Sequence, residues 1–316
     1  MRIAILFLMT SVPRPHPSLR WLCRLAALSL GGLLLLPNGR AGEPTADNAD
    51  GSSAQLRTDK SQYNLFDPTP NDLLREFSSS RPDQTTGAHS VDAGHYYLET
   101  GLAYSLNLGS TRSDTWDYFQ STHFRAGLTD SIELELIWGG IHNTRSRTAH
   151  SDSTVNGSTD LTVRTRLILV GNESKVFAFS IDPEINLPTQ SHHIDSEYVT
   201  GDVIFATSFK LPDGFSTTIN VTPGITRNDA DTKNEFGLVT GITLYHSLFR
   251  KQDRVQLYVE YYDTLVTGPG STDARQADIG VRWRPWENIQ FDAGCNFGVS
   301  ADASDYQPFV GFVTRF

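Results

Sequence analysis

The sequence predicts an all-β protein, a closed antiparallel up-and-down transmembrane β-barrel of about 12 strands with a short N-terminal helix. Three observations favour this fold: an export signal, a two-residue hydrophobic period from residue 95 to residue 316, and connectors that alternate between short and long. A composition of 38% hydrophobic and 20% charged residues is too polar for a bundle of membrane helices, and it is sufficient for a folded domain.

Residues 1–41 have the parts of a secretory signal peptide. Five arginines and no acidic residue accompany the apolar stretch Leu25–Leu36, and small residues follow up to Ala41. A helix over this stretch would rise about 18 Å, well short of the ~30 Å hydrocarbon core, so we expect cleavage rather than a permanent span. Removal of these residues changes the formal net charge from −10 to −15.

Charge and cysteine content exclude several classes of function. The chain has 26 lysines and arginines against 36 acidic residues, which disfavours any nucleic-acid partner. Its two cysteines are Cys23, inside the signal peptide, and Cys295. A single mature thiol leaves no pair for a zinc ribbon, a disulfide or a redox centre.

Residues 42–94 are predicted to form a flexible leader with a short helix. The segment 43–66 is polar and has no apolar period. Thr69 is a candidate N-cap and Pro70 suits the first helical position, so we expect an amphipathic helix over residues 70–78. Two placements remain open: a plug in the barrel mouth or lumen, or a periplasmic tail.

Residues 95–316 are predicted to form the barrel. In the first strand, apolar residues such as Leu98 and Leu102 fall on one parity, and smaller or polar residues such as Glu99 fall on the other. The predicted strands are His95–Asn107, Trp116–Leu128, Ile132–Trp138, Leu161–Leu169, Val176–Leu187, Val203–Lys210, Phe215–Ile225, Phe236–His246, Val255–Val266, Gln276–Arg284, Ile289–Val299 and Tyr306–Phe316. Longer polar loops are expected around residues 141–158, 188–200, 227–233 and 267–274.

A soluble β-sandwich is the alternative fold, because its polar parity would face water. Aromatic residues near strand ends favour the barrel, since they match the girdles at membrane interfaces: Trp116, Tyr118, Trp138, Tyr261, Trp283 and Trp286. The terminal Phe316 is typical of the last strand of bacterial outer-membrane barrels, and we expect the assembly machinery to bind it. The last strand must pair with the first, because an open edge in hydrocarbon leaves backbone groups unsatisfied.

Several segments together resemble a known family: Tyr63–Pro70 (YNLFDPTP), Arg81–Thr86 (RPDQTT), Val91–Glu99 (VDAGHYYLE) and the later Leu187–Thr189. They are similar to the outer-membrane transporters of the phenol-degradation meta-pathway family, and the resemblance covers residues 63–316. It implies a barrel and the passage of small hydrophobic or aromatic compounds. It assigns no binding residue to this chain.

The residues themselves suggest which charges face the lumen. Arg81 and Asp83 precede the first strand, where this pair would tie the leader to the lumen wall. The inward parity of the strands carries nine further charged residues: Arg125, Glu133, Glu135, Arg164, Arg166, Glu184, Glu260, Asp278 and Arg282. Such mixed charges either line a wet pore or cross-link into a closed, salt-bridged interior.

Motifs for catalysis or metal binding are missing. No GxSxG elbow, HExxH helix, P-loop or EF-hand loop occurs, so we expect neither an enzyme nor a cofactor. The nearest candidate for the dyad of a barrel phospholipase is Tyr245-His246-Ser247, but adjacent residues point to opposite faces. A surface metal site would draw on His142, His150, His192, His193, Asp152, Asp195 and Glu197, although solvated loop side chains without fixed geometry are the favoured interpretation, so no metal is expected.

The sequence therefore favours an outer-membrane channel or transporter through which small molecules diffuse, with membrane lipid and a small solute as its partners. A closed structural or adhesion barrel, whose extracellular loops bind a partner, is the second hypothesis, and an unrecognised membrane enzyme is the third. Lumen width separates the first two, because twelve strands exceed the eight that side chains can just fill.

Overall fold

The computed structural model describes residues 59–109, 112–173, 176–191, 198–227, 233–248, 254–267 and 272–316. The predicted signal peptide, the leader up to residue 58, and His192, His193, Asp195 and Glu197 lie outside the described residues. Among the described residues, no helix is long and apolar enough to cross a bilayer.

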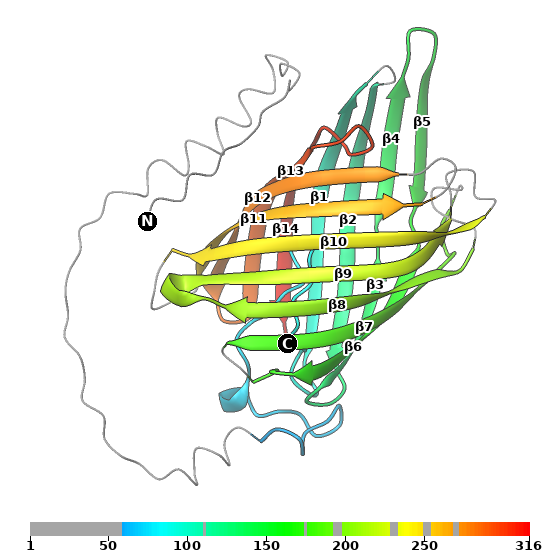
Figure 1. The fold of residues 1–316 in the computed structure, drawn as a ribbon. Helices are drawn as coiled ribbons and strands as arrows, with labels where there is room; N and C mark the ends of the chain where they lie inside the picture. The colour runs from blue at the N-terminus through cyan, green and yellow to red at the C-terminus, as the bar shows by residue number, and fades with distance from the viewer. Residues whose placement is uncertain are drawn as a thin grey trace, which may run out of the picture. The chain divides into compact units, whose positions relative to one another are not determined.

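The described chain from residue 96 onward forms one antiparallel sheet that closes on itself (Figure 1). Closure occurs where the last strand pairs with the first, with Leu102 opposite Val310, as the sequence predicted. The strands are β1 (Tyr96–Leu108), β2 (Arg112–Gly127), β3 (Ile132–Trp138), β4 (Ile141–Arg147), β5 (Asp152–Ser158), β6 (Leu161–Val170), β7 (Phe177–Leu187), β8 (Thr200–Lys210), β9 (Phe215–Arg227), β10 (Asn234–Ser247), β11 (Val255–Val266), β12 (Asp273–Trp286), β13 (Ile289–Gly298) and β14 (Tyr306–Arg315).

β3 and β4 are the two halves of one interrupted strand, and β5 and β6 are the halves of the next. The barrel is therefore twelve-stranded. β2 pairs with β3 through one half and with β4 through the other. The interruption between β3 and β4 falls at Gly139 and Gly140, where Gly140 has φ +104°. A Cβ atom at Gly140 would lie 2.5 Å from the backbone oxygen of Tyr118, so only glycine fits there.

The predicted loop over residues 141–158 is wrong, because β4 and β5 occupy it. Figure 1 shows this hairpin rising beyond the ends of the neighbouring strands. The segment Ile141–Arg147 (IHNTRSR) lacks the alternation of a lipid-facing strand, and most of β5 is exposed. Its pairing is held by backbone hydrogen bonds rather than by apolar burial, so the hydrophobic period could not reveal it.

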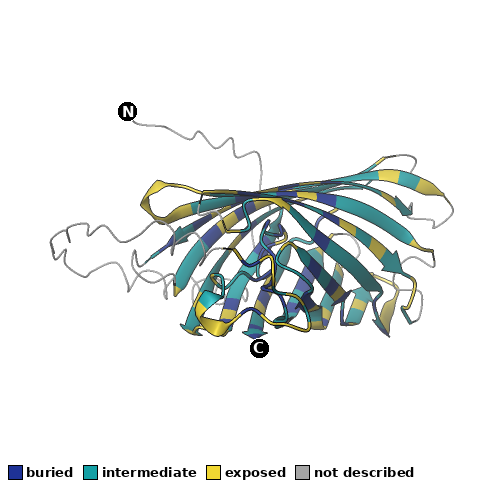
Figure 2. Ribbon diagram, turned by 90° about the horizontal axis from the view of Figure 1, so that it is seen from below, coloured by how far each residue is buried: buried dark blue, intermediate teal, exposed yellow. Residues whose placement is uncertain are grey.

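Burial is inverted relative to a soluble protein. On β3, Glu133 and Glu135 are fully buried, whereas Leu136 is 38% exposed. Buried and exposed bands alternate along the strands (Figure 2). A soluble sandwich would bury the apolar parity, so this pattern excludes it and matches an outward apolar face surrounded by lipid.

Aromatic residues stack on the outward face near the strand ends. Tyr104 and Trp116 lie 4.8 Å apart between ring centroids, and Trp116 stacks on Tyr118 at 6.3 Å. At the other end, Trp283 packs on Phe291 at 5.8 Å. These positions correspond to the two interfacial girdles of an outer-membrane barrel.

The leader has less helix than the sequence predicted. Over residues 70–78 the structure has one 3₁₀ turn, Asn71–Leu73, after which Leu74 is extended. The backbone amide of Arg75 donates to the Asp92 carboxylate at 2.8 Å, which draws the chain away from a helical path. A local N-cap signal was therefore overridden by a contact that is distant in sequence.

Candidate functional site

The leader residues from Ser78 to Ala93 lie against side chains of the inner barrel wall. Wall carboxylates bind the main chain of this segment directly. Both oxygens of Glu99 on β1 accept from the Ser80 amide, at 3.1 and 3.0 Å. An extended chain has unpaired backbone donors, so such contacts provide the partners that a sheet would otherwise supply.

A second stretch of the leader is bound by side chains of β3 and β9. Glu133 on β3 accepts from the Val91 amide at 2.6 Å. Asn220 on β9 binds Thr86 twice, accepting from its amide at 2.6 Å and donating to its carbonyl at 3.0 Å. The leader is thus fixed to widely separated strands, and it crosses the space between them.

Arg81 and Asp83 are both buried against the wall, where the structure places the pair that the sequence selected. Arg81 donates to Asp292 on β13 at 3.2 Å. Asp83 accepts hydrogen bonds from Tyr245 on β10 and Arg282 on β12. Each leader charge therefore has an opposite charge on the wall.

The side chain of Arg81 lies in a slot made by two glycines. Gly101 on β1 and Gly311 on β14 are direct partners in the strand register. A Cβ atom at Gly101 would lie 2.6 Å from an Arg81 guanidinium nitrogen. The guanidinium occupies space that a larger side chain on the wall would fill.

Five of the predicted and additional inward charges form one buried network beside the leader. Arg125 binds Glu99 at 2.9 Å and Glu133 at 2.7 Å, and Arg166 binds Asp182 at 2.8 Å and Glu133 at 3.5 Å. All five side chains are at most 1% exposed. Breaking one partner of such a pair costs about 3–5 kcal/mol, because a charge is left buried without compensation.

A second group of charges adjoins the first, since Arg125 Nε also lies 4.0 Å from Glu135. Arg164 on β6 binds Glu184 at 2.6 Å and Glu135 at 3.1 Å. Glu135 also binds the His123 imidazole, with Nδ1 and Oε1 2.5 Å apart. His123 in turn contacts Ser121, with Nε2 and Oγ 2.8 Å apart.

The remaining predicted charges lie in the other half of the wall. Glu260 on β11 accepts from the amides of Gln84 and Thr85, each at 2.8 Å. Asp278 on β12 is buried directly opposite Glu260 in the strand register. The parity argument therefore identified nine wall residues whose side chains are buried or nearly so, but it could not name their partners.

Another group of charges fixes the leader at the end of the barrel with short turns. Arg75 binds Glu173 at 2.6 Å and also binds Asp130, while Lys60 binds Asp92 and Glu173 at 3.1 Å each. Burial raises the pKa of Asp130, and the Arg75 guanidinium partly offsets that effect. Sequence reasoning missed this group, since its members lie outside the strands and none follows a period.

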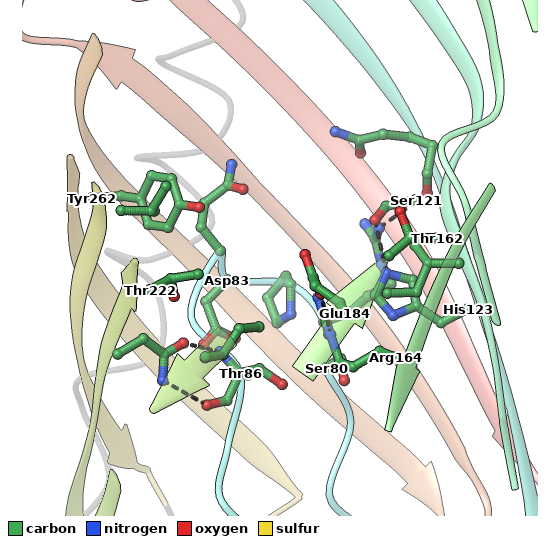
Figure 3. Close-up of a pocket in the computed structure, with 18 of the residues that line it drawn as sticks. Ser80, Asp83, Thr86, Ser121, His123, Thr162, Arg164, Glu184, Thr222 and Tyr262 are labelled. Carbon is green, nitrogen blue, oxygen red and sulfur yellow. Dashed lines mark hydrogen bonds and ion pairs between the residues drawn. The ribbon is translucent and has the colours of Figure 1, made fainter. Parts of the chain in front are cut away.

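A cavity of about 280 Å³ lies in the barrel interior, between the leader and the inner face of the wall (Figure 3). The leader residues 80–84 and Thr86 form part of its lining. The wall lining is mainly polar and comprises Gln120, Ser121, His123, Ile137, Thr162, Arg164, Glu184, Asp202, Ile204, Asn220, Thr222, Val239, Tyr262, Asn296 and Phe309. Pockets for drug-sized ligands have volumes of about 300–1,000 Å³. This cavity is slightly smaller, so it suits a small molecule.

The histidines considered for a metal site are not gathered. His142 lies on β4 rather than in a loop, with its Nε2 3.4 Å from Asp117. His150 is in the turn between β4 and β5. No group of three metal-binding side chains is found in the described part of the chain.

Four wall side chains that bind the leader were not selected as lumen residues from the sequence: Glu99, Asn220, Tyr245 and Asp292. All four lie on the inward parity of their strands, so the same pattern would have found them. Tyr245 and His246 do diverge as expected, because Tyr245 binds Asp83 while His246 stacks on Phe215 at 4.3 Å.

Comparison with known proteins gives one family match and several similar outer-membrane structures. The sequence profile of a family described as "Putative MetA-pathway of phenol degradation" matches residues 79–316. No curated protein matches the chain. Among solved structures, an outer-membrane channel from Pseudomonas putida F1 is similar with 10% identity and a TM-score of 0.53, covering 74% of this chain and 100% of that one.

Two further structures are similar at lower scores. The translocator domain of the autotransporter NalP from Neisseria meningitidis has 12% identity and a TM-score of 0.42, covering 70% of this chain and 88% of that one. The KdgM porin has 13% identity and a TM-score of 0.38, covering 68% of this chain and 99% of that one.

Proposed function

The chain belongs to the phenol-degradation meta-pathway family of outer-membrane β-barrels, and from this premise we propose that it is a channel for the diffusion of small molecules whose leader is a removable plug. The observation that carries the proposal is the binding of the leader main chain by wall carboxylates, such as Glu99 to Ser80. A twelve-stranded barrel has room for a lumen, and here that room is occupied by a peptide segment rather than by wall side chains alone.

Plugging by hydrogen bonds is reversible in principle. Each hydrogen bond of the leader is one that water or an entering polar group can replace, because the net value of such a bond is about 0.5–1.5 kcal/mol, and more where a charge takes part. The apolar contacts of the leader are few and small, with Phe77 packed on Tyr97 at 4.9 Å and Val91 in the same cluster. The plug can therefore leave without exposing a large apolar core.

The cavity lining supports one class of solute. Its lining is polar and charged with isolated apolar residues such as Ile204 and Phe309, which suits a small ring that carries a hydroxyl or another polar group. Such a solute agrees with the family description and with the volume of the cavity. Diffusion needs no catalytic group, so the pathway itself requires none.

The remaining partners follow from the barrel. Membrane lipid surrounds the outward apolar face. Phe316 is 59% exposed, and its backbone amide donates to Tyr96 at 3.0 Å across the closing seam. We propose that the assembly machinery binds this exposed terminal residue.

Liposome uptake tests the channel proposal. Mature protein and a variant lacking residues 43–94 are reconstituted, and entry of small sugars and of small aromatics such as phenol is measured. We expect uptake to rise when the leader is deleted, with aromatics preferred. Absence of flux in both forms would contradict a channel and favour the closed structural or adhesion barrel.

A further inference from the structure

The wall of the cavity contains a serine, a histidine and a glutamate bonded in series. Ser121 and His123 lie two residues apart on β2, and Glu135 lies on the adjacent β3. His123 is 2.8 Å from the Ser121 hydroxyl through Nε2 and 2.5 Å from the Glu135 carboxylate through Nδ1. Figure 3 shows Ser121 and His123 together at one side of the cavity.

One tautomer of His123 satisfies both of its hydrogen-bond partners. Glu135 also accepts from Arg164 at 3.1 Å, and a carboxylate bonded to a guanidinium has no proton to donate. In the tautomer with the proton on Nδ1, His123 donates to Glu135, and Nε2 accepts from the Ser121 hydroxyl. This is the order of groups in which a general base activates a serine nucleophile and a third group orients the base.

Ser121 lies in a bulge of β2 where it and Phe119 both have positive φ. Ser121 has φ +49°, a left-handed conformation that residues other than glycine seldom adopt. Its amide donates to Gly139 at 3.3 Å, so the bulge of β2 is held where β3 gives way to β4. Serine nucleophiles of hydrolases lie on similarly strained turns, which expose the hydroxyl to substrate.

We propose that Ser121 and His123 form a hydrolytic site for small carboxylic esters, with Glu135 as a positioning residue. Both catalytic side chains line the cavity, and so does Arg164. The Arg164 guanidinium is paired with Glu135 and Glu184, and through Glu135 it helps to orient His123. The volume of about 280 Å³ restricts the substrate to short acyl and alcohol groups.

The reaction balances with water as the only co-substrate. The Ser121 oxygen bonds to the ester carbonyl carbon while its proton moves to His123 Nε2. The bond to the alcohol oxygen breaks, and His123 gives that oxygen its proton. Water then attacks the acylated serine with His123 as base, the acyl bond to Ser121 breaks, and the serine regains a proton as the carboxylic acid leaves.

The test uses the mature, refolded barrel with a fluorophosphonate probe and with 4-nitrophenyl acetate. We expect the probe to label the wild-type protein, and Ser121→Gly to abolish labelling and lower the hydrolysis rate by at least about 100-fold. Glycine is chosen because it accepts φ +49° without strain, so the variant should fold. Heat-modifiable migration in gels verifies folding for every variant.

Matched variants separate catalysis from structure. Ser105→Ala removes another inward hydroxyl, and His142→Asn removes the imidazole that faces Asp117; both should retain labelling and hydrolysis. Glu135→Gln should lower kcat with little change in KM, which a purely structural role would not produce. Equal labelling and hydrolysis in wild type and Ser121→Gly, or no labelling of folded wild type, would overturn the proposal.

The same preparations keep this proposal separate from the proposed channel. Flux without hydrolysis in the wild type would overturn the ester-cleaving site alone. Hydrolysis without flux would overturn the channel alone.

Discussion

The backbone amide of Thr85 donates to the side chain of Glu260 at 2.8 Å, although the two residues are 175 positions apart. The hydroxyl of Thr85 also lies 2.5 Å from that of Thr243, which itself donates to Glu260 at 2.7 Å. Glu260 thus binds leader and wall with one carboxylate. Because every residue other than proline has a backbone amide, a side chain that binds such amides holds the path of a segment rather than its sequence.

Glu260→Gln tests this contact. An amide group offers one acceptor oxygen where the carboxylate offers two, so either Gln84 or Thr85 would face an NH₂ group. We expect the free energy of binding between leader and wall to weaken by about 1–3 kcal/mol. This weakening would appear as faster hydrogen exchange of the amides of residues 79–93, while exchange in the barrel strands stays unchanged.

Asp278→Asn is the matched control for that variant. Asp278 is buried opposite Glu260, and within the described part of the chain no hydrogen bond joins its carboxylate to the leader. The replacement removes no hydrogen bond to the leader, so exchange of the leader amides should stay equal. Faster exchange in Asp278→Asn than in Glu260→Gln would contradict the role given to Glu260.

Gly101→Ala tests the slot for Arg81. The new methyl group would lie 2.6 Å from the guanidinium, which is the mobile end of a long side chain. We therefore expect Arg81 to move and the leader to loosen while the barrel keeps its stability. Two quantities are measured: the hydrogen-exchange rate of the leader amides and the urea concentration at the midpoint of barrel unfolding.

A second glycine provides the control for the slot. At Gly237 an added Cβ would meet nothing closer than 3.4 Å, so Gly237→Ala should change neither quantity. If both alanine variants release the leader equally, or if neither does, the fit between Arg81 and the glycine pair has no energetic role.

Arg164 and Arg166 should behave differently when replaced by glutamate. Arg164 lines the cavity, so Arg164→Glu should shift the reversal potential of any conducting state toward cations. Arg166 is 1% exposed and binds Thr86 and Asp182, so Arg166→Glu should cost about 3–5 kcal/mol and reduce the yield of folded barrel. Bilayer recordings and refolding yields check the pair, and identical shifts in selectivity would be inconsistent with their different positions.

Much of the fold could be predicted because one rule governs most strands. Lipid outside and polar groups inside impose a period of two, so the sequence alone assigns Leu136 and Glu135 to opposite faces. The rule fails where its cause is absent. The β4–β5 hairpin lies beyond the apolar band. In the leader, the hydrogen bond between the Arg75 amide and Asp92 prevents the predicted helix from forming.

The site could be predicted only in part. Parity indicates which residues on a strand point inward, and the structure has Arg125 and Arg166, two of the charges assigned to the inward parity, buried. It says nothing about a segment without a period, so the path of the leader past Asn220 could not be derived. Ser121 and His123 lie on the same inward parity as Arg125, but parity does not reveal that they bond in series with Glu135.

A disulfide lock tests the central claim, that the leader closes the lumen. Thr85→Cys with Thr243→Cys, in a Cys295→Ser background, joins leader to wall where the two hydroxyls are 2.5 Å apart. Thr115→Cys with Thr144→Cys joins two wall strands at a comparable 3.0 Å and serves as control. We predict that oxidation of the first pair alone abolishes conductance and solute uptake and that a reductant restores both; equal conductance in the oxidised and reduced states would contradict the plug.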